Sequence, residues 1–442
     1  MEICNNDFKY SQTSDQIVHT TNHKPQTTNK VPELMSPAGD WTMLSAAINA
    51  GADAVYFGVD KLNMRAKAAN FTVDELPEIV KACREKKVKT YLTLNTIVFE
   101  EELHELEEII SSAKQAGVNR IICWDLAVTQ ICRKHDMPFC ISTQGSVSNS
   151  LSADLYKQLG AVRIVLAREC SLEEIKKIRA VTDLEIEAFI HGAMCIAVSG
   201  RCFMSHHLFG PSANRGECIQ PCRREYEVKD TITGKPMIMG EGYVLSAKDL
   251  CTVEFIDQLI EAGIDSFKIE GRKRSPEYVA KTVSVYRRAI DLYFEKKLTP
   301  EIKKELLKEL EEVYNRGFSS GFYFGKPGSE DYADIYGSKA TTRKEIAGKV
   351  INYYKQAKVA YIQLESGKIS VNDTLLIIGP TTGVVEVKPA EIQIENEKAE
   401  TAGKGDRVTF PCSELVRPND RVYIVINSGS EEIKDKKVPV NK

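Results

Sequence analysis

Four cysteines lie within a 28-residue stretch of the chain, and their spacing is the first feature that could carry chemistry. Cys195, Cys202, Cys218 and Cys222 follow the pattern Cys-x6-Cys-x15-Cys-x3-Cys. Thiolates are preferred ligands of zinc and of iron–sulfur clusters. Structural zinc sites usually pair cysteines about two to four residues apart, so the first interval of six is loose for zinc. The spacing leaves a cluster, a zinc ion and no metal as open alternatives.

Disulfide and nucleophile functions fit these cysteines less well. Residues 1–12 contain no apolar run, so we expect no secretory signal and a reducing compartment, where disulfides are rare. A thiol paired with His191, His206 or His207 would be peptidase chemistry. Such chemistry needs one cysteine rather than four, and the sequence has no GxSxG elbow and no HExxH helix. A peptidase is therefore the minority hypothesis.

Composition indicates a soluble globular protein with two or three domains. The chain has 442 residues, of which 43% are hydrophobic and 27% charged, with a formal net charge of −3. Because the total charge is negative, a nucleic-acid partner would need a local basic patch. No apolar segment approaches the roughly 18 residues of a membrane span, so we expect a cytoplasmic protein without a membrane partner. The other cysteines, such as Cys123 and Cys140, lie in apolar contexts that predict core positions.

The cysteine stretch follows the seventh of eight apolar or β-branched segments that alternate with helical patterns. In the helical segments apolar residues recur at i, i+3, i+4 and i+7. Buried parallel strands joined by helices predict an α/β fold, and eight of them favour a (β/α)8 TIM-like barrel over an open sheet. The predicted strands are 33–36, 54–59, 89–95, 120–125, 139–144, 163–169, 185–192 and 266–271.

The same patterns divide the chain into domains. Residues 1–30 are polar and predict a disordered tail. The barrel is expected over 31–335, interrupted by a cysteine-bearing insertion at about 193–250. Period-two alternation between hairpin turns predicts a small C-terminal antiparallel β-barrel over 340–430, and 431–442 form a second tail.

Polar residues stand where several predicted barrel strands end. In this fold the loops that follow the strands build the active site, so these side chains should converge with the cysteines. Any one of them is explained equally well as a salt bridge at the rim, but together they predict a polar pocket. They are Arg65, Asn95, Gln144, Arg168, Lys268, Glu270 and Arg272.

The stretch EAFIHGAMCIAVSGRCFMS at 187–205 resembles the fingerprint of the collagenase-like peptidase family of unassigned catalytic type. Further matching motifs are STQGSVSN, RIVLARE, NRGECIQPCR and FKIEGRKRSPEYVA, and the resemblance covers about residues 31–430. Despite the family name, members that resemble this chain from end to end are prephenate-dependent tRNA uridine hydroxylases, which form 5-hydroxyuridine at the wobble position. Other members hydroxylate a ribosomal RNA cytidine or a ubiquinone precursor.

This resemblance implies a cofactor and partners. By that resemblance Cys195, Cys202, Cys218 and Cys222 hold a [4Fe–4S] cluster. Prephenate is the co-substrate, the anticodon loop of tRNA is the RNA partner, and a paralogous protein partner is a further expectation. A true peptidase, a hydroxylase of a ribosomal RNA cytidine and a non-catalytic RNA-binding scaffold that carries a cluster stay open as alternatives.

Roles for individual residues follow from the chemistry of these substrates. Prephenate is a dicarboxylate, and guanidinium and ammonium groups recognise carboxylates well. The predicted substrate-binding residues are Arg65, Asn95, Gln144, Arg168, Lys268 and Arg272. The predicted proton-transfer residues are Glu187, His191 and Glu270. Phosphate contacts are expected from the basic groups Arg223–Arg224, Arg272–Lys273–Arg274 and Arg287–Arg288.

Overall fold

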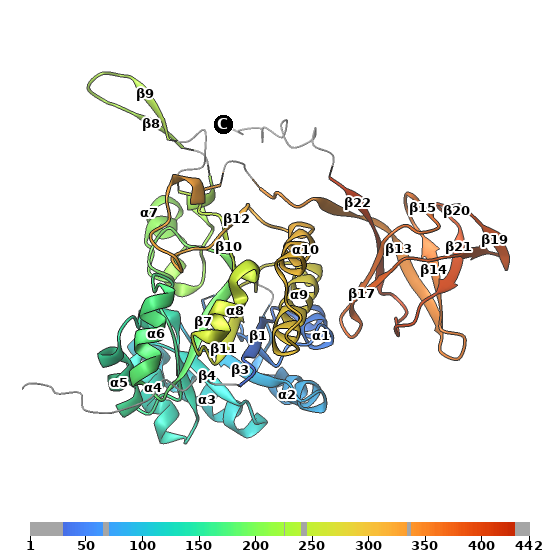
Figure 1. The fold of residues 1–442 in the computed structure, drawn as a ribbon. Coiled ribbons are helices and arrows are strands. Elements are labelled where there is room, and N and C mark those ends of the chain that lie inside the picture. The colour runs from blue at the N-terminus through green and yellow to red at the C-terminus, as the bar shows by residue number, and fades with distance from the viewer. Residues whose placement is uncertain (1–29, 65–69, 225, 240–244, 334–336, 429–442) are drawn as a thin grey trace, which may run out of the picture.

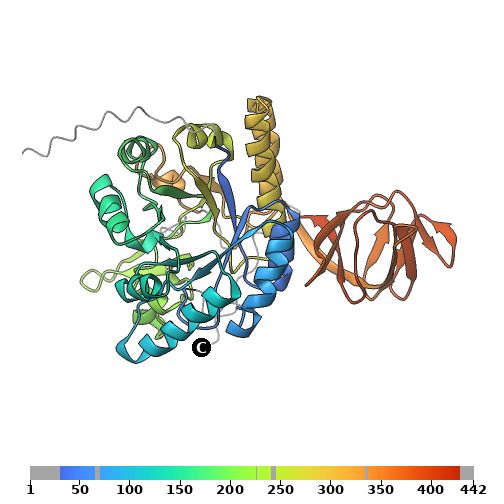
Figure 2. The ribbon, with the colours of Figure 1, turned by 90° about the horizontal axis from the view of Figure 1, so that it is seen from below.

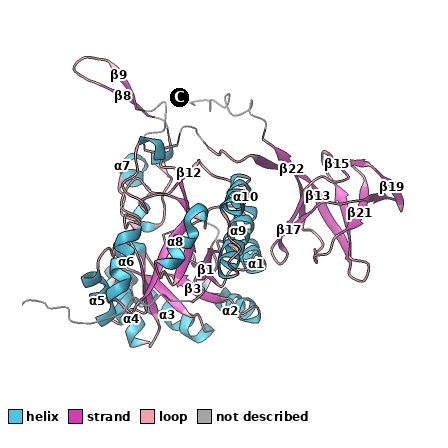
Figure 3. Cartoon of the chain, in the orientation of Figure 1, coloured by secondary structure: helices cyan, strands magenta, loops and turns pink. Residues whose placement is uncertain are grey.

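The computed structural model shows a helix-covered barrel followed by a separate antiparallel sheet domain (Figures 1 and 3). It describes residues 30–64, 70–224, 226–239, 245–333 and 337–428. Arg65 and nearly all of the two predicted tails therefore lie outside the described residues.

Eight parallel strands close into the predicted barrel. Each strand pairs with the next in chain order, and the last strand closes the ring by pairing with both the first and the seventh. The prediction of a (β/α)8 barrel is confirmed, with every strand at its predicted place. The strands are β1 (Glu33–Pro37), β2 (Ala54–Phe57), β3 (Lys89–Thr93), β4 (Arg120–Cys123), β5 (Phe139–Ile141), β6 (Arg163–Val165), β7 (Glu185–Ala193) and β11 (Ser266–Ile269).

Helices follow the strands and cover the outside of the barrel (Figure 1). Their apolar faces pack on it, and polar caps such as Asp40 and Ser171 bind the free N–H groups of the first turns. They are α1 (Trp41–Asn49), α2 (Leu76–Glu85), α3 (Leu103–Ala116), α4 (Leu126–Lys134), α5 (Ser150–Gln158), α6 (Leu172–Val181), α8 (Ile256–Glu261), α9 (Pro276–Phe294) and α10 (Pro300–Glu311). Across the described parts of the chain, every helix is too short or too polar to cross a membrane.

The cysteine-bearing segment leaves the barrel after β7 and returns before α8. It contains α7 (Met204–Phe209), the hairpin of β8 (Tyr226–Lys229) and β9 (Pro236–Met239), and β10 (Asp249–Cys251). β10 runs antiparallel to the end of β7 and also pairs with β12 (Phe318–Ser319). The segment is therefore anchored to the barrel wall, and the hairpin projects beyond α7 (Figure 1).

The C-terminal domain is an antiparallel sheet that curls around its own core (Figure 2). Side chains alternate between buried and partly exposed along β14, as the period-two pattern predicted. The eight strands of the sheet are β13 (Thr342–Tyr354), β14 (Val359–Leu364), β16 (Leu375–Gly379), β17 (Gly383–Val387), β18 (Ile392–Ile394), β19 (Glu397–Ala399), β21 (Arg407–Pro411) and β22 (Arg421–Asn427). β15 (Lys368–Ser370) and β20 (Thr401–Gly403) form a separate two-stranded ribbon.

The sheet domain contacts the barrel through the turn before β17, which lies against α1. Ser45 donates a hydrogen bond to the carbonyl of Pro380 at 2.6 Å, and Asn49 donates one to Thr382 at 3.1 Å. Gly383 adopts φ +70°, and a Cβ there would lie 2.7 Å from the backbone nitrogen of Ala46. Only glycine fits this contact, because it combines a left-handed backbone with close approach of another chain segment.

Candidate active site

A cavity of about 160 Å³ opens at the C-terminal end of the barrel strands, and all four clustered cysteines line it. The barrel topology brings them together with strand-end residues that are far apart in sequence. The predicted residues that line this cavity with the cysteines are Asn95, Gln144, Arg168, Lys268, Glu270 and Arg272.

The cysteines at the cavity are free thiols. Cys195 is exposed and the other three are partly buried. Burial raises the thiol pKa of Cys222, while the neighbouring Arg223 lowers it and the thiols of Cys195 and Cys218 raise it further. These mutual effects place three of the four sulfurs in one electrostatic environment. The scattered cysteines behave as predicted, since those in the described residues are buried core side chains.

Four cysteine thiols around one cavity are a donor set compatible with an iron–sulfur cluster. Within the described ranges, no three His, Cys, Asp or Glu side chains converge on a point that one ion would occupy. In a [4Fe–4S] cluster each thiolate binds its own iron, so the four sulfurs need not converge on one point. The backbone N–H of Gln220 donates to Sγ of Cys218 at 3.4 Å, and such N–H donors to sulfur tune clusters. The residues present therefore fit the group that the sequence predicted.

Two cations are held over aromatic rings at the cavity wall. Nζ of Lys268 lies 2.8 Å from Oε1 of Glu187 and 4.4 Å from the ring centre of Tyr56. The guanidinium of Arg168 lies 4.0 Å from the ring centre of Phe189. The Nε–H of Arg168 is buried and has no hydrogen-bond partner among the described residues. An unpaired donor beside a cavity is costly unless a ligand or a rearrangement satisfies it, which is the behaviour expected of a binding residue.

A third cation, Arg272, reaches the cavity from the loop after β11. Its Nη1 donates to Oδ1 of Asn63 at 3.1 Å and to Oγ1 of Thr93 at 2.9 Å. The side-chain amides of Asn95 and Gln144 are hydrogen-bonded to each other, with Nδ2 of Asn95 donating to Oε1 of Gln144 at 3.0 Å. These buried contacts fix the polar groups before any ligand binds, so little reorganisation is needed on binding.

Glu270 is the one predicted proton-transfer residue that lines the cavity. The backbone N–H of Glu270 donates to the carbonyl of His191 at 2.9 Å. The backbone carbonyl of Glu270 accepts a hydrogen bond from the hydroxyl of Tyr278 at 3.2 Å. A Cβ at Gly192 would lie 2.7 Å from that carbonyl, and Gly192 adopts φ +108°. The glycine between His191 and the first cysteine thus lets two strand ends approach closely.

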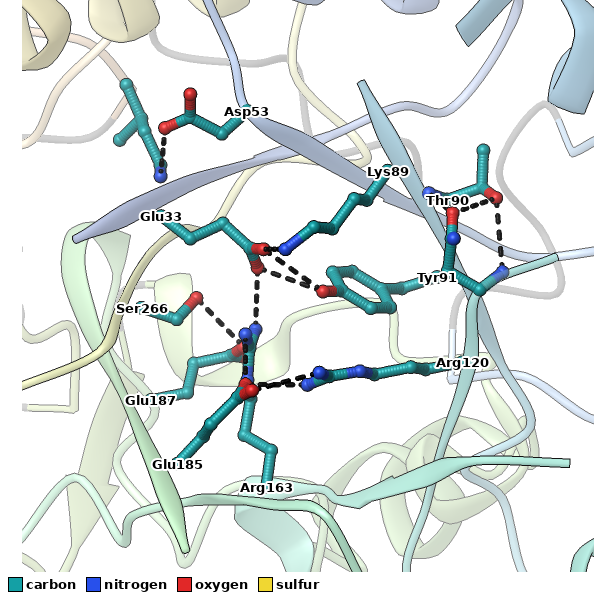
Figure 4. Close-up of polar contacts among 12 residues, drawn as sticks. Glu33, Asp53, Lys89, Thr90, Tyr91, Arg120, Arg163, Glu185, Glu187 and Ser266 are labelled. Carbon is teal, nitrogen blue, oxygen red and sulfur yellow. Dashed lines mark hydrogen bonds and ion pairs between the residues drawn. The ribbon is translucent and has the colours of Figure 1, made fainter. Parts of the chain in front are cut away.

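Glu187 lies beneath the cavity rather than in its wall. Its carboxylate bridges Lys268 at 2.8 Å and Arg163 at 2.9 Å. Arg163 also binds Glu33 at 2.7 Å and Glu185 at 2.6 Å (Figure 4). Burial would raise the pKa of Glu187, but the charges of Lys268 and Arg163 outweigh it and hold the pKa below its usual value. The carboxylate is therefore ionised and enclosed, which makes it an anchor for Lys268 rather than a group that reaches substrate.

His191 does not reach the cavity either. The pairing of β7 with β11 shifts register between Lys268 and Ile269, so a bulge turns His191 outward. Its ring packs against Tyr278, Tyr286 and Phe318 and is 1% exposed. Burial lowers the pKa of this histidine to about 4. The neutral, enclosed ring is a core residue in this structure, contrary to the prediction that it faces substrate.

Most of the predicted phosphate contacts are wrong, because the arginines are buried or paired. Arg223 is a cavity-wall residue that donates to the backbone carbonyls of Met194 and Ala247. Arg274 binds Asp249 at 3.5 Å. Arg272 is buried as described above, Arg287 binds Asp53 and Asp291, and Arg288 binds Glu309. Arg224, Lys273 and Arg288 are the exposed members of these groups, and Arg288 is paired with Glu309.

Sequence reasoning missed the aromatic floor of the cavity. Tyr56 and Phe189 line it and lie beneath the cations Lys268 and Arg168. Both aromatics occupy strand positions, where large side chains are ordinary core residues, so their types carried no signal. A signal was present in the alternation of β7, because Glu187 and Phe189 are two residues apart and share the inner face.

The described residues contain no Cys–His pair of the kind that a thiol peptidase uses. His206 is exposed and its Nδ1 lies 2.6 Å from the carbonyl of Gly210, and His191 is enclosed among aromatic rings. No hydrogen bond joins a histidine to a cysteine in the described ranges. Among the described residues, therefore, no histidine is placed to activate a cavity thiol.

Residues 39–333 match the protein-family model described as Peptidase family U32. An uncharacterized protease of Methanocaldococcus jannaschii is 44% identical over 403 residues, covering 89% of this chain and 98% of the relative. A protein named Collagenase from Porphyromonas gingivalis is 41% identical, covering 88% and 97%. The tRNA hydroxylation protein P1 of Bacillus subtilis is 39% identical, covering 79% of this chain and 84% of that protein.

Proposed function

Because this chain belongs to peptidase family U32, we propose that it is a tRNA hydroxylase that forms 5-hydroxyuridine at the wobble position with prephenate as co-substrate. The observation that carries the proposal is the single cavity in which four free thiols and three fixed cations meet. A relative that is 39% identical over most of both chains acts in tRNA hydroxylation. Together these favour RNA modification over proteolysis.

In this proposal Cys195, Cys202, Cys218 and Cys222 would hold a [4Fe–4S] cluster at one wall of the cavity. Such a cluster supplies electron transfer or Lewis-acid chemistry when it is bound. Burial, the larger effect, raises the thiol pKa of Cys222, whereas the positive charge of the neighbouring Arg223 lowers it.

The cations Arg168, Lys268 and Arg272 would bind the two carboxylates of prephenate. Lys268 donates one N–H to Glu187 and makes no other hydrogen bond among the described residues, so two donors remain for a ligand. The ion pair with Glu187 fixes the position of the Lys268 ammonium in the cavity wall. Glu270 is the carboxyl in the cavity wall that would accept or return a proton.

The RNA base would enter the same mouth from outside the barrel. A base in a duplex cannot reach a pocket at the end of a barrel, whereas an unpaired base of a loop can be turned out of its stack. This requirement favours an anticodon loop over a helical stem. In this arrangement prephenate would bind deep in the cavity, and the RNA would cover the opening of the cavity.

Mass analysis of tRNA nucleosides tests this function in cells. A strain that lacks the gene should lose 5-hydroxyuridine, and the wild-type gene should restore it. Arg272→Gln should fail to restore it, because the buried guanidinium in the cavity wall is lost. Arg288→Gln removes an exposed arginine paired with Glu309 far from the cavity and should restore it fully. Unchanged tRNA in the deleted strain contradicts the proposal.

A peptidase is the second candidate, favoured by the names of the two relatives at 44% and 41% identity. It predicts that purified protein cleaves denatured collagen and that loss of one cysteine, but not removal of metal, abolishes cleavage. Retained tRNA modification without any cleavage decides against it.

A further inference from the structure

Large apolar side chains are exposed on the cysteine-bearing segment. Five of the sixteen exposed large hydrophobic side chains among the described residues fall between 198 and 219, a concentration that scattered surface residues do not explain. Phe203 is the most exposed of the five, at 72%. We call this set the rim; its members are Val198, Phe203, Leu208, Phe209 and Ile219.

The rim is a single surface next to the cavity. Val198 belongs to the rim and also lines the cavity, and Phe203 directly follows the cavity residue Cys202. The backbone N–H of Ile219 donates to the hydroxyl of Ser205 in α7 at 3.1 Å, so the two parts of the rim are tied together. The rim therefore adjoins the cavity lining at Val198 and Phe203.

Arginines accompany the aromatic rings here. The guanidinium of Arg224 lies 4.3 Å from the ring centre of Phe209, and both side chains are exposed. Arg201, also exposed, lies 4.9 Å from the ring centre of Trp124 and donates to the backbone carbonyl of Gln144 in the cavity wall. The opening is thus flanked by flat groups, both aromatic rings and guanidinium planes.

The charge of this segment is opposite to that of the whole chain. Residues 194–224 contain four arginines and a single acidic residue, Glu217, whereas the full chain has a formal net charge of −3. A surface that joins exposed aromatic rings to positive charge suits an unpaired nucleic acid, whose bases stack and whose phosphates are negative. Of the four arginines, Arg215 is paired with Glu102 and Arg223 is bound to backbone carbonyls. Arg201 and Arg224 are therefore the exposed ones that can contact a partner.

We propose that the rim is a stacking platform for unpaired nucleotides that flank the target base, with Phe203 and Phe209 stacking on bases and Arg201 and Arg224 contacting bases or phosphates. The inference rests on the proposed function, because it identifies the surface on which an RNA substrate lies. It adds a binding mode that the cavity does not contain. The deep cavity selects the base, and the rim holds its neighbours.

The test measures binding of a fluorescein-labelled seven-nucleotide single-stranded RNA that contains uridine, by anisotropy, to the full chain purified without oxygen. Phe203→Ala should raise the Kd about tenfold, a typical effect of losing one base stack. Phe203→Trp should keep wild-type affinity, because it retains a flat ring. Phe203→Leu should resemble Phe203→Ala, since it keeps apolar contact but cannot stack. Leu151→Ala, at an exposed leucine on α5, is the control and should bind as the wild type does.

Three results would overturn the platform. Unchanged binding by Phe203→Ala together with Phe209→Ala removes the rim from RNA recognition. Full binding by Phe203→Leu with loss in Phe203→Ala indicates a plain apolar contact, as a protein partner would use. Wild-type protein that binds neither this RNA nor tRNA removes the platform and the proposed function together, whereas wild-type binding with unaffected variants removes the platform alone.

Discussion

The carboxylate of Glu187 lies 2.8 Å from Nζ of Lys268 and links the buried ionic network of the barrel to the candidate active site. On its other side the same carboxylate binds Arg163, which is almost fully buried. Buried ions need partners, because each unpaired charge loses its hydration without compensation. The position of a cavity cation is therefore set by residues that no substrate touches.

Replacing Glu187 with glutamine should destabilise the protein strongly. The change keeps the shape but leaves Lys268 without its counter-ion and Arg163 with one fewer, which typically costs about 3 kcal/mol or more. Urea unfolding measures the difference from the wild type. Asp183→Asn breaks the exposed pair with Lys157 and should change stability little. Equal effects of the two variants would show that Glu187 is not an ionised anchor.

Lys268→Met should weaken binding of prephenate by about tenfold or more, because a hydrogen bond from a charged donor to a carboxylate is lost. Isothermal titration calorimetry with the purified protein measures the Kd. Lys281 is a matched control, since it also lies 2.8 Å from a glutamate, Glu312, but on α9 outside the barrel. Lys281→Met should bind prephenate as the wild type does. Equal binding by Lys268→Met would exclude this lysine as a prephenate ligand.

The enclosed His191 should make stability depend on pH. Its folded pKa of about 4 lies below the ordinary value of about 6.5, so protons favour the unfolded chain. Burial is the main cause, Asp249 and Glu270 act in the opposite direction, and Arg274 adds to the lowering. The stability from the neutral ring is complete above about pH 6.5 and is lost as pH falls toward 4, at up to about 1.4 kcal/mol per pH unit.

His191→Gln should remove this part of the pH dependence. Urea unfolding at pH 7, 6 and 5 should show the wild type losing about 1 kcal/mol more than the variant between pH 6 and pH 5. The variant is the control for every other titrating group, because it differs at this ring alone. Parallel stability profiles would mean that the imidazole titrates normally and is open to solvent.

The fold could be predicted because its signals are local. The alternation of apolar strands and amphipathic helices fixed the barrel, and the barrel topology alone brings Asn95 and Lys268 to the same end. The direction of a side chain at the edge of a strand was not predictable. His191 points outward because of a bulge against β11, which depends on pairing between residues far apart in sequence.

The burial of charged side chains was the second feature that could not be predicted from the sequence. Arg223 and Arg274 have the sequence context of surface arginines, yet inside the protein Arg223 donates to the carbonyls of Met194 and Ala247, and Arg274 binds Asp249. Partners contributed by distant loops leave no periodic trace in the sequence. The same limit hid the role of Glu187, whose partners Arg163 and Lys268 belong to other strands.

The measurement that tests the account most directly is the iron and sulfide content of protein purified without oxygen. We predict about four irons and four sulfides per chain, lost in Cys195→Ala at the cavity and kept in Cys412→Ala, a buried thiol of the C-terminal domain. Wild-type protein with no iron, or iron retained in Cys195→Ala, would contradict the claim that these four cysteines hold a cluster.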